Sequence, residues 1–76
     1  MNRIVTNHEL WNLPSEQISK MSKGRPIRIV QTNGEVNEIT VKELLLAANP
    51  PHLFTGFRST DNEVFSLPLI DYVELI

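Results

Sequence analysis

The fold is decided by residues 26–39, which read PIRIVQTNGEVNEI. Ile27 and Ile29 alternate with Arg28, and this period of two is typical of a strand that buries one face. An Asn-Gly pair follows at 33–34, and both residue types readily adopt the positive φ that a tight hairpin needs. We therefore predict an antiparallel hairpin at the centre of the fold.

The register of this hairpin depends on the length of its loop. A three-residue loop over 32–34 sets Arg28 opposite Glu38, whereas a two-residue loop sets Arg28 opposite Ile39. The longer loop also forms two apolar pairs, Val30 with Val36 and Ile27 with Ile39. Each matched cross-strand pair contributes about 0.2 to 1 kcal/mol, so the pairs together favour the three-residue loop. In that loop Gly34 takes the left-handed conformation of a bulge.

The N-terminal part of the chain carries helix signals. Thr6 and Glu9 have the spacing of a capping box, in which each side chain accepts a hydrogen bond from the other residue's backbone N–H. Pro14 has no backbone N–H to donate, so it interrupts the helix. A second helix is expected over 15–22, and Gly24 is placed to end it.

Residues 41–48 admit two interpretations. Thr40 and Glu43 repeat the capping-box spacing, and Asn-Pro-Pro at 49–51 stops a helix, so we expect a short helix near 41–48. The alternative is that the same apolar residues extend the second strand of the hairpin, because runs this short are ambiguous by period. The three leucines at 44–46 cannot all point inward from one short helix, so at least one is expected near the surface.

Three further strands are expected in the C-terminal half of the chain. Residues 53–58 form the first, and Gly56 within it leaves room for a sharp bend or for the close approach of another backbone. A turn at 59–62 leads to a strand over 64–67. Residues 72–76 alternate as the last strand.

These elements predict a single domain over residues 1–76. Residues 1–24 form a helical N-terminal segment, and residues 25–76 form a small five-stranded antiparallel barrel of the SH3-like or Sm-like kind, mainly β with an N-terminal helix (α+β). The 41% of hydrophobic and 21% of charged residues are typical of a globular protein. Because a core of this size is small, self-association or a partner is expected to supplement it.

The order of apolar strands and turns resembles two families of small barrels. The residues that carry the resemblance are Ile27-Arg28-Ile29-Val30, Asn33-Gly34-Glu35, Leu44, Gly56-Phe57 and Phe65-Ser66-Leu67-Pro68-Leu69-Ile70. This layout is similar to that of WYL-type regulatory domains and of Sm-like proteins such as the bacterial Rho-inhibiting antiterminators. The resemblance implies a regulatory module that binds a ligand, a nucleic acid or a protein. The signature Trp-Tyr-Leu of the first family is replaced by His52-Leu53-Phe54, so no binding residue is carried over.

The sequence holds no pattern of catalytic or metal-binding residues. It has no cysteine, and its two histidines, His8 and His52, stand far apart and outside any nucleophile–base motif. Its three glycines form no phosphate-binding loop. We therefore expect no enzymatic activity, no cofactor and no metal. There is no run of about 18 apolar residues and no signal-peptide pattern, so a cytoplasmic location without membrane contact is expected.

Two binding functions compete for this chain. The leading hypothesis is a small regulatory or accessory module that binds a protein partner, with a homodimer as one form of that partnership. The candidate contacts are apolar residues beyond the needs of a small core: Trp11, Leu45, Leu46 and Pro50. Trp11 either holds the N-terminal helix onto the barrel or stands exposed as an interface anchor. The alternative is nucleic-acid (RNA) binding through the cations of segment 20–28, which are Lys20, Lys23, Arg25 and Arg28.

Overall fold

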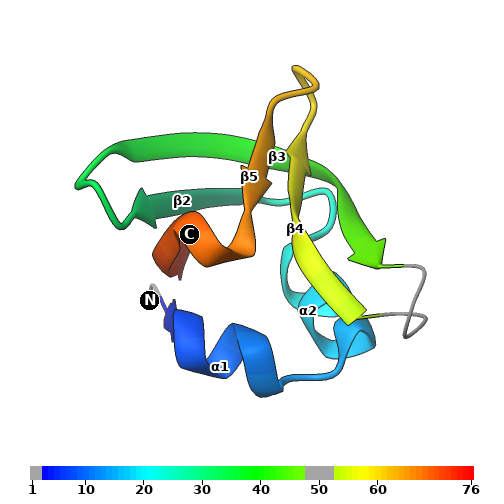
Figure 1. The fold of residues 1–76 in the computed structure, drawn as a ribbon. Helices are drawn as coiled ribbons and strands as arrows, with labels where there is room; N and C mark the ends of the chain where they lie inside the picture. Colours follow the sequence, from blue (N-terminus) through cyan, green and yellow to red (C-terminus); the bar gives the residue numbers. More distant parts are fainter. Residues whose placement is uncertain (1–2, 48–52) are drawn as a thin grey trace.

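The computed structural model describes residues 3–47 and 53–76 of the chain (Figure 1). Within these two ranges the chain forms six strands, two α-helices and one 3-10 helix. In chain order they are β1 (Arg3–Thr6), α1 (Asn7–Asn12), α2 (Ser15–Ser22), β2 (Pro26–Gln31), β3 (Val36–Ala47), β4 (Leu53–Ser59), β5 (Val64–Ser66), the 3-10 helix η1 (Leu67–Leu69) and β6 (Ile70–Leu75).

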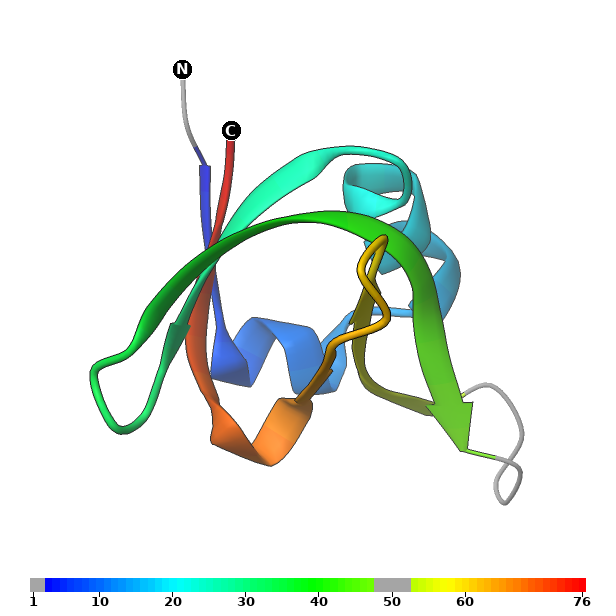
Figure 2. The same cartoon turned by 90° about the horizontal axis from the view of Figure 1, so that it is seen from above.

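All six strands belong to one antiparallel sheet in the order β1-β6-β2-β3-β4-β5. The longest strand, β3, arches over the molecule, so that residues 36–40 pair with β2 while residues 41–47 pair with β4 (Figure 2). The sheet curls without closing, because β1 and β5 remain as its two ends. The prediction of a mainly β fold with helices near the N-terminus is confirmed as far as the types of element and the antiparallel sheet are concerned.

The sheet differs from the predicted barrel in the number of its strands. It has six strands rather than five, and the additional strand is β1. This strand lies within residues 1–24, which we expected to be helical. Ile4 of β1 lies opposite Glu74 of β6, and Val5 lies opposite Val73. The partner strand is thus at the other end of the chain, so the pairing of β1 cannot be predicted from neighbouring residues.

The central hairpin has the predicted register. Arg28 lies opposite Glu38, and the two apolar pairs form as expected, Val30 with Val36 and Ile27 with Ile39. The backbone N–H of Gln31 donates to the carbonyl oxygen of Glu35 at 2.8 Å and closes the three-residue loop. Gly34 has φ +91°, the conformation that a residue with a Cβ rarely adopts.

Both N-terminal helices begin where the sequence places them. The capping box at α1 is complete: Thr6 Oγ1 accepts from the backbone N–H of Glu9, and Glu9 Oε1 accepts from the backbone N–H of Thr6, both at 3.2 Å. The second helix, α2, spans the predicted residues 15–22. Between them Leu13 and Pro14 are extended, as expected because the proline ring disfavours a helical conformation at the residue before it.

The short helix expected near 41–48 is wrong, because residues 41–47 continue β3 as an extended strand. A helix of one or two turns is only marginally stable by itself, and the capping pattern at Thr40 adds little to it. The strand instead gains backbone pairing with β4, from Val41 opposite Ser59 to Ala47 opposite Leu53, with register shifts after Val41 and after Leu45. The alternative of a strand extension is therefore the correct one for these residues.

The hydrophobic core lies between the curled sheet and the helices. Figure 2 shows α1 beneath the arch of β3, where it closes one open side of the sheet. Asn7, in the first turn of α1, donates from Nδ2 to the carbonyl oxygens of Leu67 and Ile70, at 3.1 and 2.9 Å. The buried apolar residues are Val5, Leu10, Ile18, Ile27, Ile29, Val41, Phe54, Phe57, Phe65, Leu67, Ile70 and Val73.

Candidate functional site

The second half of β3 has a neighbouring strand on one edge and a helix on the other. At Val41 the edge that faces β2 is satisfied by backbone hydrogen bonds. The N–H of Gly24 donates to the carbonyl oxygen of Val41 at 2.8 Å, and the N–H of Val41 donates to that of Arg25 at 3.1 Å. β2 pairs with β3 only as far as Thr40. Along residues 42–47 the same edge of β3 therefore has no partner strand among residues 3–47 and 53–76.

A cavity of about 380 Å³ lies between α2 and this part of β3. Its helix side is polar, with Ser15, Glu16, Ser19 and Lys23, and its strand side carries Glu43 and the apolar Leu44 and Leu46. We call this space the α2–β3 groove. Glu43 is held beside Arg58 of β4, with 3.3 Å between Oε1 and Nε. The groove thus offers apolar contact along the strand and hydrogen-bonding groups along the helix.

The four apolar residues predicted to contact a partner lie in different settings. Leu46 is 46% exposed and lines the α2–β3 groove. Leu45 is half-buried opposite Gly56 of β4, and its carbonyl oxygen accepts from Thr55 Oγ1 at 3.0 Å. Trp11 is 48% exposed on α1 and does not line the groove. Pro50 lies outside the described residues.

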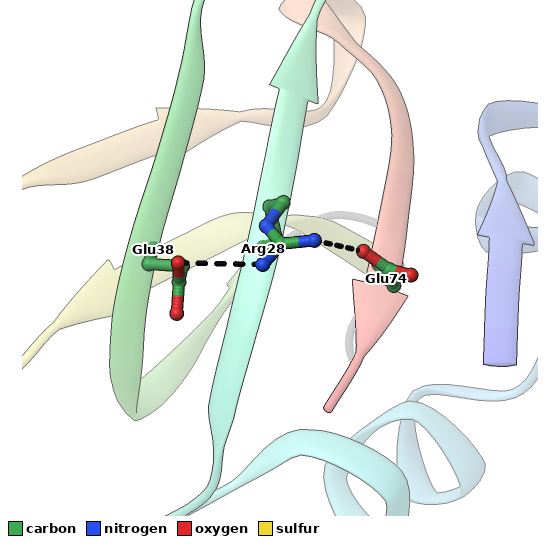
Figure 3. Close-up of polar contacts among 3 residues, drawn as sticks. All are labelled: Arg28, Glu38 and Glu74. Carbon is green, nitrogen blue, oxygen red and sulfur yellow. Dashed lines mark hydrogen bonds and ion pairs between the residues drawn. The ribbon is translucent and has the colours of Figure 1, made fainter. Parts of the chain in front are cut away.

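Arg28 is placed between two carboxylates on the outer face of the sheet. Its neighbours Ile27 and Ile29 are fully buried on the opposite face. Figure 3 shows its guanidinium reaching Glu38 of β3 and Glu74 of β6, with Nη–Oε distances of 3.4 and 2.5 Å. The hydrogen bond to Glu38, together with the negative charge of both carboxylates, raises the pKa of Arg28 above its ordinary value. Arg28 therefore stays positively charged, and the two carboxylates compensate most of that charge within the fold.

The other three predicted nucleic-acid contacts are distributed over the region around α2. Lys20 lies in its last turn, and Lys23 lines the α2–β3 groove. Arg25 lines a second, smaller cavity of about 220 Å³. Since Arg28 is paired on the outer sheet face, the four cations do not face one common cavity.

The described part of the chain holds no cluster of metal ligands. No three residues of the types His, Cys, Asp and Glu gather there in a way that could hold a metal ion. No helix of residues 3–47 and 53–76 is long and apolar enough to cross a bilayer.

Several residues of these cavities were not identified from the sequence. Glu16 and Ser19 show no motif in the sequence, Glu43 was assigned to a capping box with Thr40, and Leu44 was one of three leucines in a row. Arg3 lines the smaller cavity because β1 carries it there. The β-branched run at 4–6 was the one available signal for that strand.

The chain matches no model of a known protein family, and no curated protein and no solved structure is significantly similar to it. The resemblance to small regulatory barrels therefore stays a prediction, and the candidate function rests on geometry.

Proposed function

We propose that this protein is a small non-enzymatic regulatory or accessory module that binds an extended segment of a protein partner in the α2–β3 groove. The observation that carries the proposal is the edge of residues 42–47, which faces a cavity instead of a strand over the described chain. A strand edge presents backbone N–H and C=O groups that a second extended segment can pair with. Main-chain hydrogen bonds supply affinity in such complexes, and side-chain pockets supply specificity.

The lining of the groove defines the segment that it fits. Leu44 and Leu46 stand on the strand side, so alternate apolar side chains of a bound segment can pack against them. Ser15, Ser19 and Glu16 on the helix side favour polar or cationic side chains at the intervening positions. A second copy of this chain, paired by the same edge, is one form that the partner can take.

Nucleic-acid binding through Lys20, Lys23, Arg25 and Arg28 is the weaker candidate. Phosphate recognition gains its affinity from several unpaired cations on one surface. Here Arg28 is held by Glu38 and Glu74, and Lys23 shares the groove with Glu16 and Glu43. Of these carboxylates, Glu16 and Glu43 line the groove, where they can accept hydrogen bonds from a bound polypeptide.

A selection experiment with peptides of random sequence tests the proposal. A display library of such peptides is panned against the wild-type protein, and a recovered peptide is titrated into ¹⁵N-labelled protein. We expect chemical-shift changes centred on residues 42–47 and on the facing side of α2, with binding lost in Leu46→Glu. Leu69→Glu is the matched control, because Leu69 is 57% exposed on η1 and away from the groove.

Two results contradict the proposal. Either the recovered peptides shift residues outside the groove, or Leu46→Glu and Leu69→Glu bind them equally well. Light scattering over a range of concentrations, in the wild type and in Leu46→Glu, reports in parallel whether a second copy occupies the groove.

A further inference from the structure

We infer that the protein carries a second binding site, at the smaller cavity beside β1, for an acidic segment of a protein partner. This cavity of about 220 Å³ is lined by Arg3, Met21, Arg25, Pro26, Leu75 and Ile76. None of these residues lines the α2–β3 groove, so the inference goes beyond the function proposed above.

Two arginines from separate chain segments, Arg3 and Arg25, line this cavity. Arg3 belongs to β1, where it lies opposite Leu75 of β6. Its Nη1 is 3.6 Å from the sulfur of Met21, in the last turns of α2. Arg25 reaches the cavity from the turn between α2 and β2. The arrangement brings two positively charged residues to the lining of one partly apolar space.

These two arginines differ from the other two of the chain in having no counter-ion within the described residues. Arg28 pairs with Glu38 and Glu74, and Arg58 pairs with Glu43. No carboxylate of residues 3–47 and 53–76 lies within ion-pair distance of Arg3 or Arg25. Two like charges at one cavity repel each other, and an anion between them removes that repulsion. Guanidinium groups bind carboxylates through paired N–H donors.

The surroundings of the arginines favour a polypeptide as the source of the anion. The cavity is smaller than the roughly 300 to 1,000 Å³ of a typical small-molecule pocket, so it suits one or two side chains. Met21, Pro26 and Leu75 offer apolar contact beside the charges. β1 is an end strand of the sheet, so an extended segment can pair with its outer edge and place acidic side chains near Arg3.

The probe for this site is a short synthetic peptide in which glutamate alternates with valine. It is titrated into ¹⁵N-labelled protein, and the Nε–Hε signals of the arginines are followed. We expect saturable shifts of the Arg3 and Arg25 signals, weakened by added salt. In Arg3→Gln and in Arg25→Gln we expect binding about tenfold weaker, because each variant loses a charge-assisted hydrogen bond.

The control variant is Lys42→Gln, which removes one positive charge elsewhere. Lys42 is exposed, its Nζ contacts Asn62 Oδ1 at 3.3 Å, and it does not line the smaller cavity. It is expected to change the affinity by less than about twofold. Both arginines are exposed, so their variants are expected to keep the fold, which thermal unfolding verifies.

Four results overturn the inference. The glutamate peptide fails to bind; a peptide with glutamine in place of glutamate binds equally well; Lys42→Gln weakens binding as much as Arg3→Gln; or a single-stranded oligonucleotide binds the same arginines more tightly than the peptide does. Leu46→Glu is expected to leave binding of this peptide unchanged, so failure at this site is distinguished from failure at the α2–β3 groove.

Discussion

Gly56 of β4 lies directly against the backbone of Phe65 in β5. A Cβ at position 56 would stand 3.2 Å from the carbonyl carbon of Phe65 and closer still to its oxygen. The two residues are one step out of register in the β4–β5 pairing, where Gly56 faces Ser66 and Phe57 faces Phe65. The close approach of another backbone expected at this glycine is therefore confirmed.

Gly56→Ala is predicted to destabilise the fold by about 2 to 3 kcal/mol, because a main chain cannot move aside as a flexible side chain can. The comparison is Gly34→Ala, where a Cβ would meet no atom within 4 Å and the cost comes only from φ +91°. That cost is about 1 kcal/mol. Urea unfolding of both variants measures the difference, and an equal or smaller effect at position 56 contradicts the tight packing of β4 on β5.

Asn7→Ala is predicted to destabilise the protein by about 1 to 3 kcal/mol, since it removes two part-buried hydrogen bonds to backbone carbonyl groups. Asn7 Nδ2 connects α1 to η1 and β6 through the oxygens of Leu67 and Ile70. Asn12→Ala is the control, because Asn12 is exposed and its amide bonds only within α1, to His8. If both variants unfold at the same urea concentration, the two hydrogen bonds of Asn7 contribute nothing to the free energy of unfolding.

Arg28→Gln is predicted to lower stability across the neutral and moderately alkaline range by a constant amount. The pKa of Arg28 is raised in the folded protein, chiefly by the hydrogen bond to Glu38. A raised pKa gives stability that is present below the unfolded value and is lost only as pH rises through the folded value. For an arginine this loss lies at strongly alkaline pH.

The check is the difference in thermal midpoint between wild type and Arg28→Gln, measured from about pH 7 to about pH 10. If the difference in thermal midpoint disappears within that interval, the guanidinium of Arg28 is not the group that supplies the additional stability. Raised salt is expected to reduce the difference, because both ion pairs of Arg28 are partly exposed to solvent.

The parts of the fold that follow from local sequence were predicted correctly, and those that depend on distant partners were not. The loop over 32–34 and the box of Thr6 with Glu9 are specified by residues a few positions apart, so their register and caps could be predicted. β1 could not, because its partner is β6 at the far end of the chain. The capping pattern at Thr40 predicts a helix over the following residues, but residues 41–47 pair with β4 as a strand.

In the candidate sites, too, features set by neighbouring residues could be predicted, and features that need distant segments could not. Leu46 was predicted as a contact because an apolar run next to prolines leaves a residue at the surface, and it is exposed. The groove itself needs α2 beside β3, and the residues that line its two sides are at least 20 positions apart in the sequence. The pairing of Arg28 with Glu38 was expected across the hairpin, but its second carboxylate, Glu74, comes from β6. Only the folded chain brings Arg3 and Arg25 to one cavity.

The proposed function depends most on the edge of residues 42–47 as the place where a partner segment is added. Amide hydrogen exchange of these residues, with and without a selected peptide, tests this most directly. We expect amides along this edge to exchange more slowly when the peptide is bound, and this protection to be absent in Leu46→Glu. Unchanged exchange over residues 42–47 in a protein saturated with peptide would contradict the proposed function.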